Sequence, residues 1–367
     1  TIDSSLSTVD GTTITGCTFN LDSPGIGVWI GGPSPAYAVS NVEMSSNTFN
    51  GPGDQISNPW KIGGWFGHPI ACAVSGVEFV NNTVDRGSIP INLDDENIDG
   101  VLIAGNTFTN TDGVVYVWGE GDPTGVLSDF VFNCNDVDST NSYGVGIDVG
   151  GTAFGDANFG EGNEFQCNNF TGIVGAYGFG AVSILSDLTS YTLDATKNWW
   201  GDVSGPTHTN NPDGTGSPIS DNVVYEPWSY TPDPCEPKSK GFWKNHPDSL
   251  EAVLVFGGTP WEIGTFEIWD HKDAEEIFNN ASGKYAENML AAQLLAAELN
   301  AVHLMLHLGI DICPDVVEAM VAADAALASY NGPDSLKIKG KDKHDMLEIS
   351  EVLDGFNNGE LCEGLCE

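Results

Sequence analysis

The segment INLDDENIDG, residues 91–100, places four carboxylates close together in the sequence. Loop carboxylates bind Ca²⁺, and two of them about 6.5–9.5 Å apart could act as the acid and base of an inverting glycoside hydrolase. The hydrolase interpretation lacks support, because neither a Gly-His-Gly nor an Arg-x-Lys sequence accompanies the cluster. We therefore expect a calcium site or a solvated acidic turn. The candidate ligands are Asp94, Asp95, Glu96 and Asp99.

Two histidines in an apolar segment, His303 and His307, are a second candidate for metal binding. Their four-residue spacing places both rings on one face of a helix, which suits metal ligands. The glutamate that follows the first histidine in zinc proteases is absent, because Leu304 stands there. We expect an ordinary half-buried pair.

Eight cysteines could form disulfides. Cys134 and Cys167 occupy matching positions of the repeat described below, where Cα atoms about 5 Å apart would be within disulfide range, so we predict a bridge between them. Cys17 and Cys72 could pair, stay buried or link subunits. The cysteines near the carboxyl terminus would add one or two disulfides to a modest core, with their pairing open, and the last two could instead bind zinc. These four are Cys235, Cys313, Cys362 and Cys366.

The charge of the chain limits its partners. Twelve Lys and Arg against 52 Asp and Glu give a formal net charge of -40, which excludes nucleic acid and anionic membranes as favoured partners. Divalent cations remain compatible with this charge. A hydrophobic content of 40% is too high for a disordered acidic tail, so the charge must cover a folded body. No cofactor is required by these residues, and calcium is the candidate that they favour.

Several features predict export. No run of 18 apolar residues is present, so we expect no membrane span. The sequence starts at Thr1 and contains eight cysteines, which favours a secreted chain that has lost a leader and lies in an oxidising exterior. Three Asn-x-Ser/Thr sequences permit glycosylation, at Asn81, Asn169 and Asn280.

A repeat runs through residues 1–200 and must position many of these groups. Alignment on a recurring asparagine gives steps of 24 to 35 residues, with Cys17 in the same position of the first repeat. Apolar residues stand three positions before and two positions after this position throughout. Periods of this length indicate a repeat architecture. The aligned residues are Asn47, Asn82, Asn106, Asn135, Asn168 and Asn198.

The two apolar columns are five residues apart, and this odd offset would place them on opposite faces of an unbroken strand. We therefore expect a bend at each asparagine, which tolerates a left-handed backbone and hydrogen-bonds its counterparts in the neighbouring turns. Stacked corners of this kind predict a mainly β fold that winds through about seven coils. A β-sandwich is the alternative, but its strands would not repeat in matched columns.

The columns resemble those of right-handed parallel β-helix proteins over about residues 10–228. The sequence NWWGD at 198–202, with Ser-Gly-Pro at 204–206, resembles the closing segment of such domains in archaeal and bacterial surface proteins. The resemblance implies a β-helix domain of residues 1–228. Physically, Trp199 and Trp200 offer large apolar area to cover the last coil.

A Pro-rich segment, residues 229–240, is interpreted as a linker to a second domain of residues 241–367. The segments 285–308 and 314–330 have the composition of long helices, and a third helix follows around 344–353, so this cysteine-bounded domain should be small and mostly α-helical. Its GFWKNHP and LDGFNNG sequences resemble a module of archaeal and bacterial secreted surface proteins, which implies a location rather than an activity. Trp243, His246 and Asn357 could line a site, although packing and turn roles are favoured.

The leading functional hypothesis is an extracellular structural protein without enzymatic activity. It would polymerise with itself through the β-helix ends and the carboxyl-terminal module into a surface layer, sheath or filament. The alternative is a polysaccharide hydrolase or lyase, or a glycan-binding adhesin, with a groove lined by Trp29, Trp60, Trp65 and Trp118. Lyases of acidic sugars need cationic groups, and residues 1–228 offer only three, namely Lys61, Arg86 and Lys197.

Overall fold

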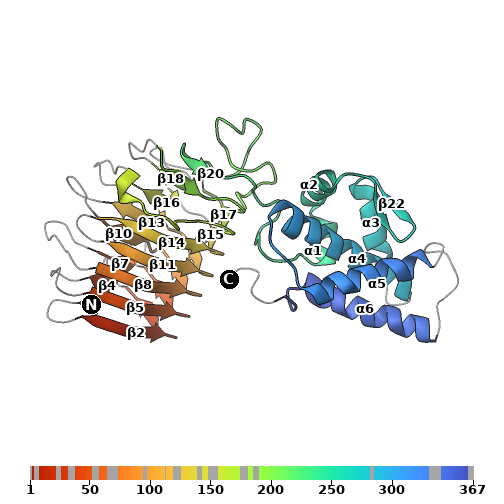
Figure 1. The fold of residues 1–367 in the computed structure, drawn as a ribbon, viewed down its shortest axis with the longest axis horizontal. Coiled ribbons are helices and arrows are strands. Elements are labelled where there is room, and N and C mark those ends of the chain that lie inside the picture. The colour runs from red at the N-terminus through yellow and green to blue at the C-terminus, as the bar shows by residue number, and fades with distance from the viewer. Residues whose placement is uncertain are drawn as a thin grey trace. The chain divides into compact units, whose positions relative to one another are not determined.

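The chain divides into an amino-terminal unit, Thr1–Pro234, and a helical unit, Cys235–Glu367 (Figure 1). The boundary falls inside the segment 229–240 that the sequence predicts as a linker. Ser229 N donates to Asn198 O at 2.9 Å, and Lys238 N donates to Asn300 Oδ1 at 2.7 Å, so each end of that segment is fixed within its own unit. The computed structural model describes residues 2–3, 8–21, 26–31, 38–51, 58–63, 73–93, 97–111, 113–118, 125–138, 143–147, 156–173, 181–184, 190–281, 285–329 and 340–362.

Three parallel sheets build the amino-terminal unit, and up to β16 each takes every third strand of the chain (Figure 1). Sheet A contains β1 (Ile2–Asp3), β4 (Ile26–Gly31), β7 (Asn58–Ile62), β10 (Ile89–Asn92), β13 (Gly113–Trp118), β16 (Tyr143–Ile147) and β18 (Val182–Ile184). Sheet B contains β2 (Val9–Thr15), β5 (Ala38–Ser45), β8 (Ala73–Val80), β11 (Ile98–Ala104) and β14 (Leu127–Asn133). Sheet C contains β3 (Thr18–Asn20), β6 (Thr48–Asn50), β9 (Thr83–Asp85), β12 (Thr107–Thr109), β15 (Asp136–Asp138) and β17 (Asn169–Thr171).

The order of strands means that each coil, defined here as the stretch of chain that supplies one strand to each sheet, lies on the preceding coil. This arrangement is compatible with a parallel β-solenoid, and it agrees with the mostly parallel β structure that the repeat predicts. A short 3₁₀ helix, Asp156–Asn158, and a two-stranded parallel sheet complete the unit. The strands of that small sheet are β19 (Leu193–Asp194) and β20 (Val223–Val224).

The register of the sheets aligns the two apolar columns. In sheet B, Met44 pairs with Phe79, and Phe79 pairs with Ile103; all three side chains are fully buried. In sheet C, Phe49 pairs with Val84, and Val84 pairs with Phe108. Parallel in-register pairing places side chains of one column directly over one another, so the core is a continuous stack of apolar side chains.

The segment after residue 198 covers the last coil. The ring of Trp200 is fully buried and stacks on Phe170 at a centroid distance of 5.3 Å. Trp228 donates its indole N–H to Val203 O at 3.0 Å and lies against Gly205, whose φ is +79°. A Cβ atom at Gly205 would lie 2.6 Å from the Trp228 ring, so only glycine fits this turn.

The helical unit packs its elements around α4, the most buried helix of the unit (Figure 1). The predicted helix at 344–353 is part of a longer one, and the three helices before α4 and the antiparallel β21–β22 pair were not predicted from the sequence. Ser239 and Asp270 cap α1 and α3 through hydrogen bonds to backbone N–H groups. The elements are α1 (Lys240–Asn245), α2 (Pro247–Gly257), β21 (Trp261–Ile263), β22 (Phe266–Ile268), α3 (His271–Asn280), α4 (Ala286–Ala301), a π-helical turn (Val302–His307), α5 (Pro314–Ala328) and α6 (Lys341–Asn357).

Candidate functional site

The six aligned asparagines stack in a single line, called here the asparagine ladder. Asn106 shows the pattern: its Oδ1 accepts from the N and Nδ2 atoms of Asn82 at 2.8 and 3.0 Å. Its Nδ2 donates to Asn135 Oδ1 at 3.0 Å and to Phe79 O at 2.8 Å. Equivalent contacts connect the other members, and every ladder asparagine is at most 2% exposed. The ladder consists of Asn47, Asn82, Asn106, Asn135, Asn168 and Asn198.

The bend at each corner lies one residue earlier than the sequence predicts. The residue before each ladder position has a left-handed backbone, whereas the asparagine itself does not. The physical reason is that the left-handed residue redirects the chain, after which the asparagine side chain can point inward to the carbonyl groups of the preceding coil. The left-handed residues before the six asparagines, together with Gly16 before Cys17, have φ between 54° and 65°; the six are Ser46, Asn81, Gly105, Cys134, Cys167 and Lys197.

The two ends of the parallel stack differ. Trp200 covers the last coil, as described above. At the first coil, β2 pairs with β5 and β3 pairs with β6, and the described residues contain no second partner for either strand. The apolar side chains of this coil that the structure describes are only partly buried, whereas their counterparts in the next coil are at most 1% exposed. These first-coil side chains are Val9, Ile14 and Phe19.

Three of the four predicted calcium ligands, Asp94, Asp95 and Glu96, lie outside the described residues. Asp99 is exposed on β11, and its Oδ1 accepts from Ser128 Oγ of the next coil at 2.6 Å. Within the described ranges, no three His, Cys, Asp or Glu side chains are arranged to hold a metal ion. The calcium hypothesis thus stays a prediction.

The predicted bridge between Cys134 and Cys167 is wrong, because Cys134 is a thiol whereas Cys167 is disulfide-bonded. Both residues precede a ladder asparagine on consecutive coils, so equivalent Cα positions one strand spacing apart were not sufficient. A disulfide also requires Cβ atoms that converge, and residues in register on parallel coils point the same way. Cys17 is an exposed thiol, and Cys72 lies outside the described residues.

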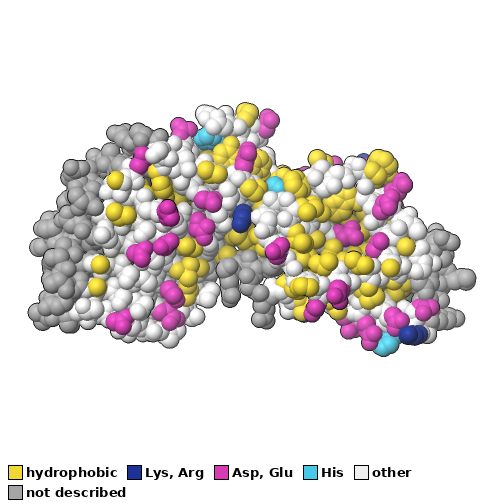
Figure 2. Space-filling view, in the orientation of Figure 1, with side chains coloured by type: hydrophobic (Ala, Val, Ile, Leu, Met, Phe, Trp, Pro, Cys, Tyr) yellow, Lys and Arg dark blue, Asp and Glu magenta, His cyan; other side chains and the backbone are white. Residues whose placement is uncertain are grey.

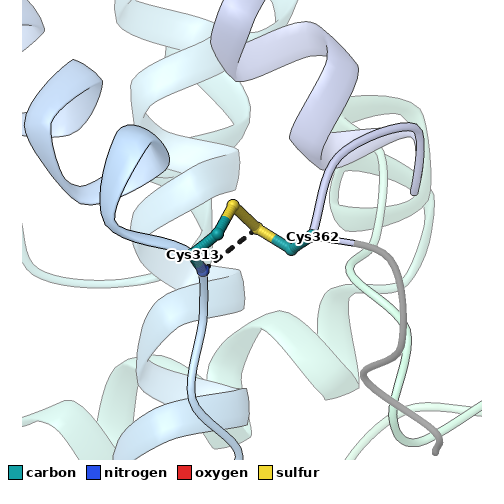
Figure 3. Close-up of a disulfide and its surroundings, with 2 residues drawn as sticks. All are labelled: Cys313 and Cys362. Atoms are coloured by element: carbon teal, nitrogen blue, oxygen red, sulfur yellow. Dashed lines mark hydrogen bonds between the residues drawn. A yellow bond between two sulfur atoms is a disulfide. The ribbon is translucent and has the colours of Figure 1, made fainter.

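In the helical unit, Cys313 and Cys362 form a disulfide with Cα atoms 5.3 Å apart (Figure 3). Cys313 N lies 3.1 Å from Cys362 Sγ. The bridge joins the residue before α5 to the turn that follows α6 and excludes Cys362 as a thiolate ligand for zinc. Cys235 is also disulfide-bonded, and Cys366 lies outside the described residues. Disulfides of this kind are typical of an oxidising compartment.

The three predicted glycosylation residues differ in surroundings. Asn81 is exposed at a corner of the coil, and Asn280 is exposed at the end of α3. Asn169 is half-buried on β17 and donates through Nδ2 to Asp136 Oδ1 at 3.1 Å. Of the three, Asn81 and Asn280 present their side chains most openly.

The tryptophans proposed for a glycan groove do not form one in the described residues. Trp60 is fully buried and stacks on Phe79, while Trp29 is half-buried and donates its indole N–H to Gly63 O at 2.7 Å. Trp65 and the side chain of Trp118 lie outside the described residues. Trp60 therefore belongs to the core rather than to a binding face.

Two of the three motif residues of the helical unit, Trp243 and Asn357, belong to a buried polar network centred on Asn300. Its Oδ1 accepts from Lys238 N at 2.7 Å and from the indole of Trp243 at 3.1 Å, and its Nδ2 donates to Lys238 O and Asn357 Oδ1, both at 2.9 Å. Asn357 in turn donates to the backbone and side-chain oxygens of Gln293 at 3.0 Å. These contacts join α1 and the segment before it to helix α4 and helix α6.

The third motif residue, His246, is exposed and lies between α1 and α2. Its backbone N–H donates to Phe242 O at 3.0 Å, and its ring stacks on Phe242. This contact ends α1. The GFWKNHP and LDGFNNG sequences therefore supply packing, capping and polar contacts within one unit.

His303 and His307 lie in the π-helical turn with ring centroids 5.9 Å apart. His303 is buried, and desolvation lowers its pKa well below the ordinary value, so the ring is neutral at pH 7. Helix α4 with this turn, Ala286–His307, is long and apolar enough to cross a membrane by length and composition, although most of its surface is buried in the unit. The composition of residues 285–308 predicts a long helix here, and the structure places it at the centre of the helical unit.

Two features of α4 were missed at the level of sequence. Glu298 is largely buried beside Asp324, and desolvation with this neighbouring carboxylate raises its pKa to about 8. Gln293 and Asn300 are seven residues apart on the same helix and both make network contacts. Polar residues inside the apolar sequence AAQLLAAELN were the available signal.

Comparisons with protein-family models, with curated proteins and with solved structures find no match for this chain. Its class is therefore defined by its own architecture: a unit of stacked parallel sheets followed by a disulfide-bonded helical unit.

Proposed function

We propose that the amino-terminal unit is a right-handed parallel β-helix and that the protein is an exported structural subunit of a surface layer, sheath or extracellular filament. The observation that carries the proposal is the difference between the two ends of the stack. One end is covered by Trp200 and the turns that follow it, whereas among the described residues the other end has edge strands and partly buried apolar side chains.

An edge strand has unpaired N–H and C=O groups that accept a strand from another chain. Val9, Ile14 and Phe19 add apolar area to such a contact, because their counterparts in the next coil are buried by the coil beneath them. A contact between this end and a different surface of a second copy is heterologous, so it extends into an open polymer.

The composition supports this function and the location. Carboxylates are spread over the visible faces of both units, and basic side chains are few (Figure 2). A net charge of -40 opposes close packing of copies unless cations screen or bridge it, which makes divalent cations plausible partners of the polymer. The disulfides favour secretion. Exposed Asn81 and Asn280 would accept glycans on an exported chain.

Substitution on the first coil tests the polymer. Ile14→Asp places a charge in the proposed contact, and Thr13→Asp places the same charge on the exposed side of the same strand. We expect the wild-type chain and Thr13→Asp to form polymers in electron micrographs and sedimentation at millimolar Ca²⁺, and Ile14→Asp to require at least tenfold more protein. Polymers of Ile14→Asp at the wild-type concentration, or a wild-type chain that stays monomeric, would contradict the proposal. Circular dichroism checks that both variants are folded.

A further inference from the structure

A cavity of about 160 Å³ lies in the helical unit, between β22, α3 and the first turns of α4. Four carboxylates line it, and its remaining wall includes apolar side chains. Two of the carboxylates already have partners: Glu267 accepts from the indole of Trp269, and Asp273 accepts from Trp269 N. The lining residues used below are Phe266, Glu267, Asp273, Glu276, Ile277 and Glu287.

Glu287 is the unusual member of this set. It is 6% exposed, and its Oε1 atom is buried with no hydrogen-bond partner. It is the second residue of α4, where the helix dipole favours a negative charge. A buried carboxylate oxygen without a donor destabilises the folded state, and a ligand that supplies the donor removes that penalty.

The size and the walls of the cavity define the ligand. The described carboxylates do not converge as a metal site would require, so a single divalent ion does not suit them. A cavity of about 150 Å³ accommodates a ligand of roughly six heavy atoms. A group with a positive end for Glu287 and a short hydrocarbon chain for Ile277 and Phe266 matches both the charge and the volume.

We propose that this cavity binds a primary alkylammonium group, with the ammonium against Glu287 and Glu276 and the alkyl chain along Ile277 and Phe266. Two sources share this chemistry: a free aliphatic amine, and a lysine side chain of another polypeptide. The site is independent of polymerisation through the first coil.

Calorimetric titration of the full chain at pH 7 tests the proposal with n-pentylamine, cadaverine, Nα-acetyl-lysine amide and neutral pentan-1-ol. We expect the amines to bind and pentan-1-ol to bind at least tenfold more weakly. Tighter binding of cadaverine than of the lysine derivative would indicate a free amine as the source, and the reverse would indicate a polypeptide. Equal binding of pentan-1-ol, or no binding of any amine at millimolar concentration, would overturn the site.

Two variants locate the binding. Glu287→Gln keeps the shape of the side chain but removes its charge, and we expect it to weaken n-pentylamine at least tenfold. Ile277→Trp should fill the cavity and abolish binding. Glu318→Gln, at an exposed position of α5, is the control and should bind as the wild-type chain does. Unchanged affinity in Glu287→Gln, with the fold confirmed by circular dichroism, would refute the assignment. n-Butylguanidine binding as tightly as n-pentylamine would refute the ammonium preference.

Discussion

The two units bury asparagine in different ways. In the amino-terminal unit, Asn106 contacts the same residue type in the coils on either side, so one set of hydrogen bonds repeats along the stack. In the helical unit, Asn300 contacts Lys238, Trp243 and Asn357, and each of these partners occurs once. The ladder forms when the same coil is repeated by translation, whereas the Asn300 network forms only when three separate segments meet at one point.

This difference has an energetic consequence. A ladder member is surrounded by copies of itself, so the contacts of each coil are confined to its nearest neighbours, as in other repeat proteins. The network around Asn300 holds together the segment before α1, α4 and α6, so its loss affects the whole helical unit. We therefore expect the loss of one ladder asparagine to destabilise mainly the neighbouring coils. We expect the loss of Asn300 to destabilise the whole helical unit at once.

The largest effect is expected for Asn106→Leu. The substitution leaves Phe79 O without its side-chain donor and removes the acceptor of the Asn82 N and Nδ2 atoms, all of which are buried. We expect a loss of roughly 3–5 kcal/mol in the free energy of unfolding of the amino-terminal unit. Urea denaturation followed by tryptophan fluorescence measures it. Ser128→Ala, which removes an exposed bond between neighbouring coils, is the control and should cost less than about 0.5 kcal/mol.

Substitution of Asn106 and Asn135 together tests whether neighbouring ladder members depend on each other. The two side chains share a hydrogen bond, so their combined cost should be smaller than the sum of the separate costs. The combination of Asn47 with Asn168, which are not neighbours in the ladder, should be additive. Additive costs for the adjacent pair would show that the ladder does not act through nearest-neighbour contacts.

The second effect concerns Asn300→Leu in the helical unit. Four buried hydrogen bonds are lost together, and we expect roughly 2–4 kcal/mol of destabilisation with a single cooperative loss of helical circular dichroism. Asn245→Ala, on the exposed surface of α1, is the matched control and should change little. A wild-type stability for Asn300→Leu would show that the network is dispensable and would remove the contrast between the units.

The smallest effect, taken per pH unit, is a pH dependence confined to the helical unit. The pKa of Glu298 is raised from 4.5 to about 8. Between these two pH values the folded unit therefore keeps a proton that the unfolded chain has already released. Stability from this group is therefore fully present below pH 4.5 and is lost as the pH rises to about 8, at roughly 1 kcal/mol per pH unit. Urea denaturation between pH 5 and 9 measures the slope. Glu298→Gln stays neutral and should flatten it; an unchanged slope would assign the dependence to another group.

The sequence correctly predicts the features that repeat from coil to coil. The spacing of Asn82, Asn106 and Asn135 was sufficient to align the apolar columns, because in-register parallel strands repeat the same environment in every coil. The predicted left-handed residue was one position too late. Residues such as Asn81, Cys134 and Cys167 precede the ladder asparagines, and residue type alone does not show which of the two neighbours turns the chain. Sequence reasoning also paired Cys134 with Cys167 on Cα spacing alone, without the direction of their side chains.

The sequence by itself determined which residues recur, and with them the parallel strands, the stacked amides and the apolar core of the amino-terminal unit. Only the tertiary structure decided the contacts that join distant and dissimilar residues: the Cys313–Cys362 disulfide, the Asn300 network and the cavity beside Glu287. The physical reason is that, in a repeat, the spacing of residues along the sequence shows which residues lie next to each other in neighbouring coils. A unique packing arrangement has no such period, and its contacts exist only once α3, α4 and α6 have come together.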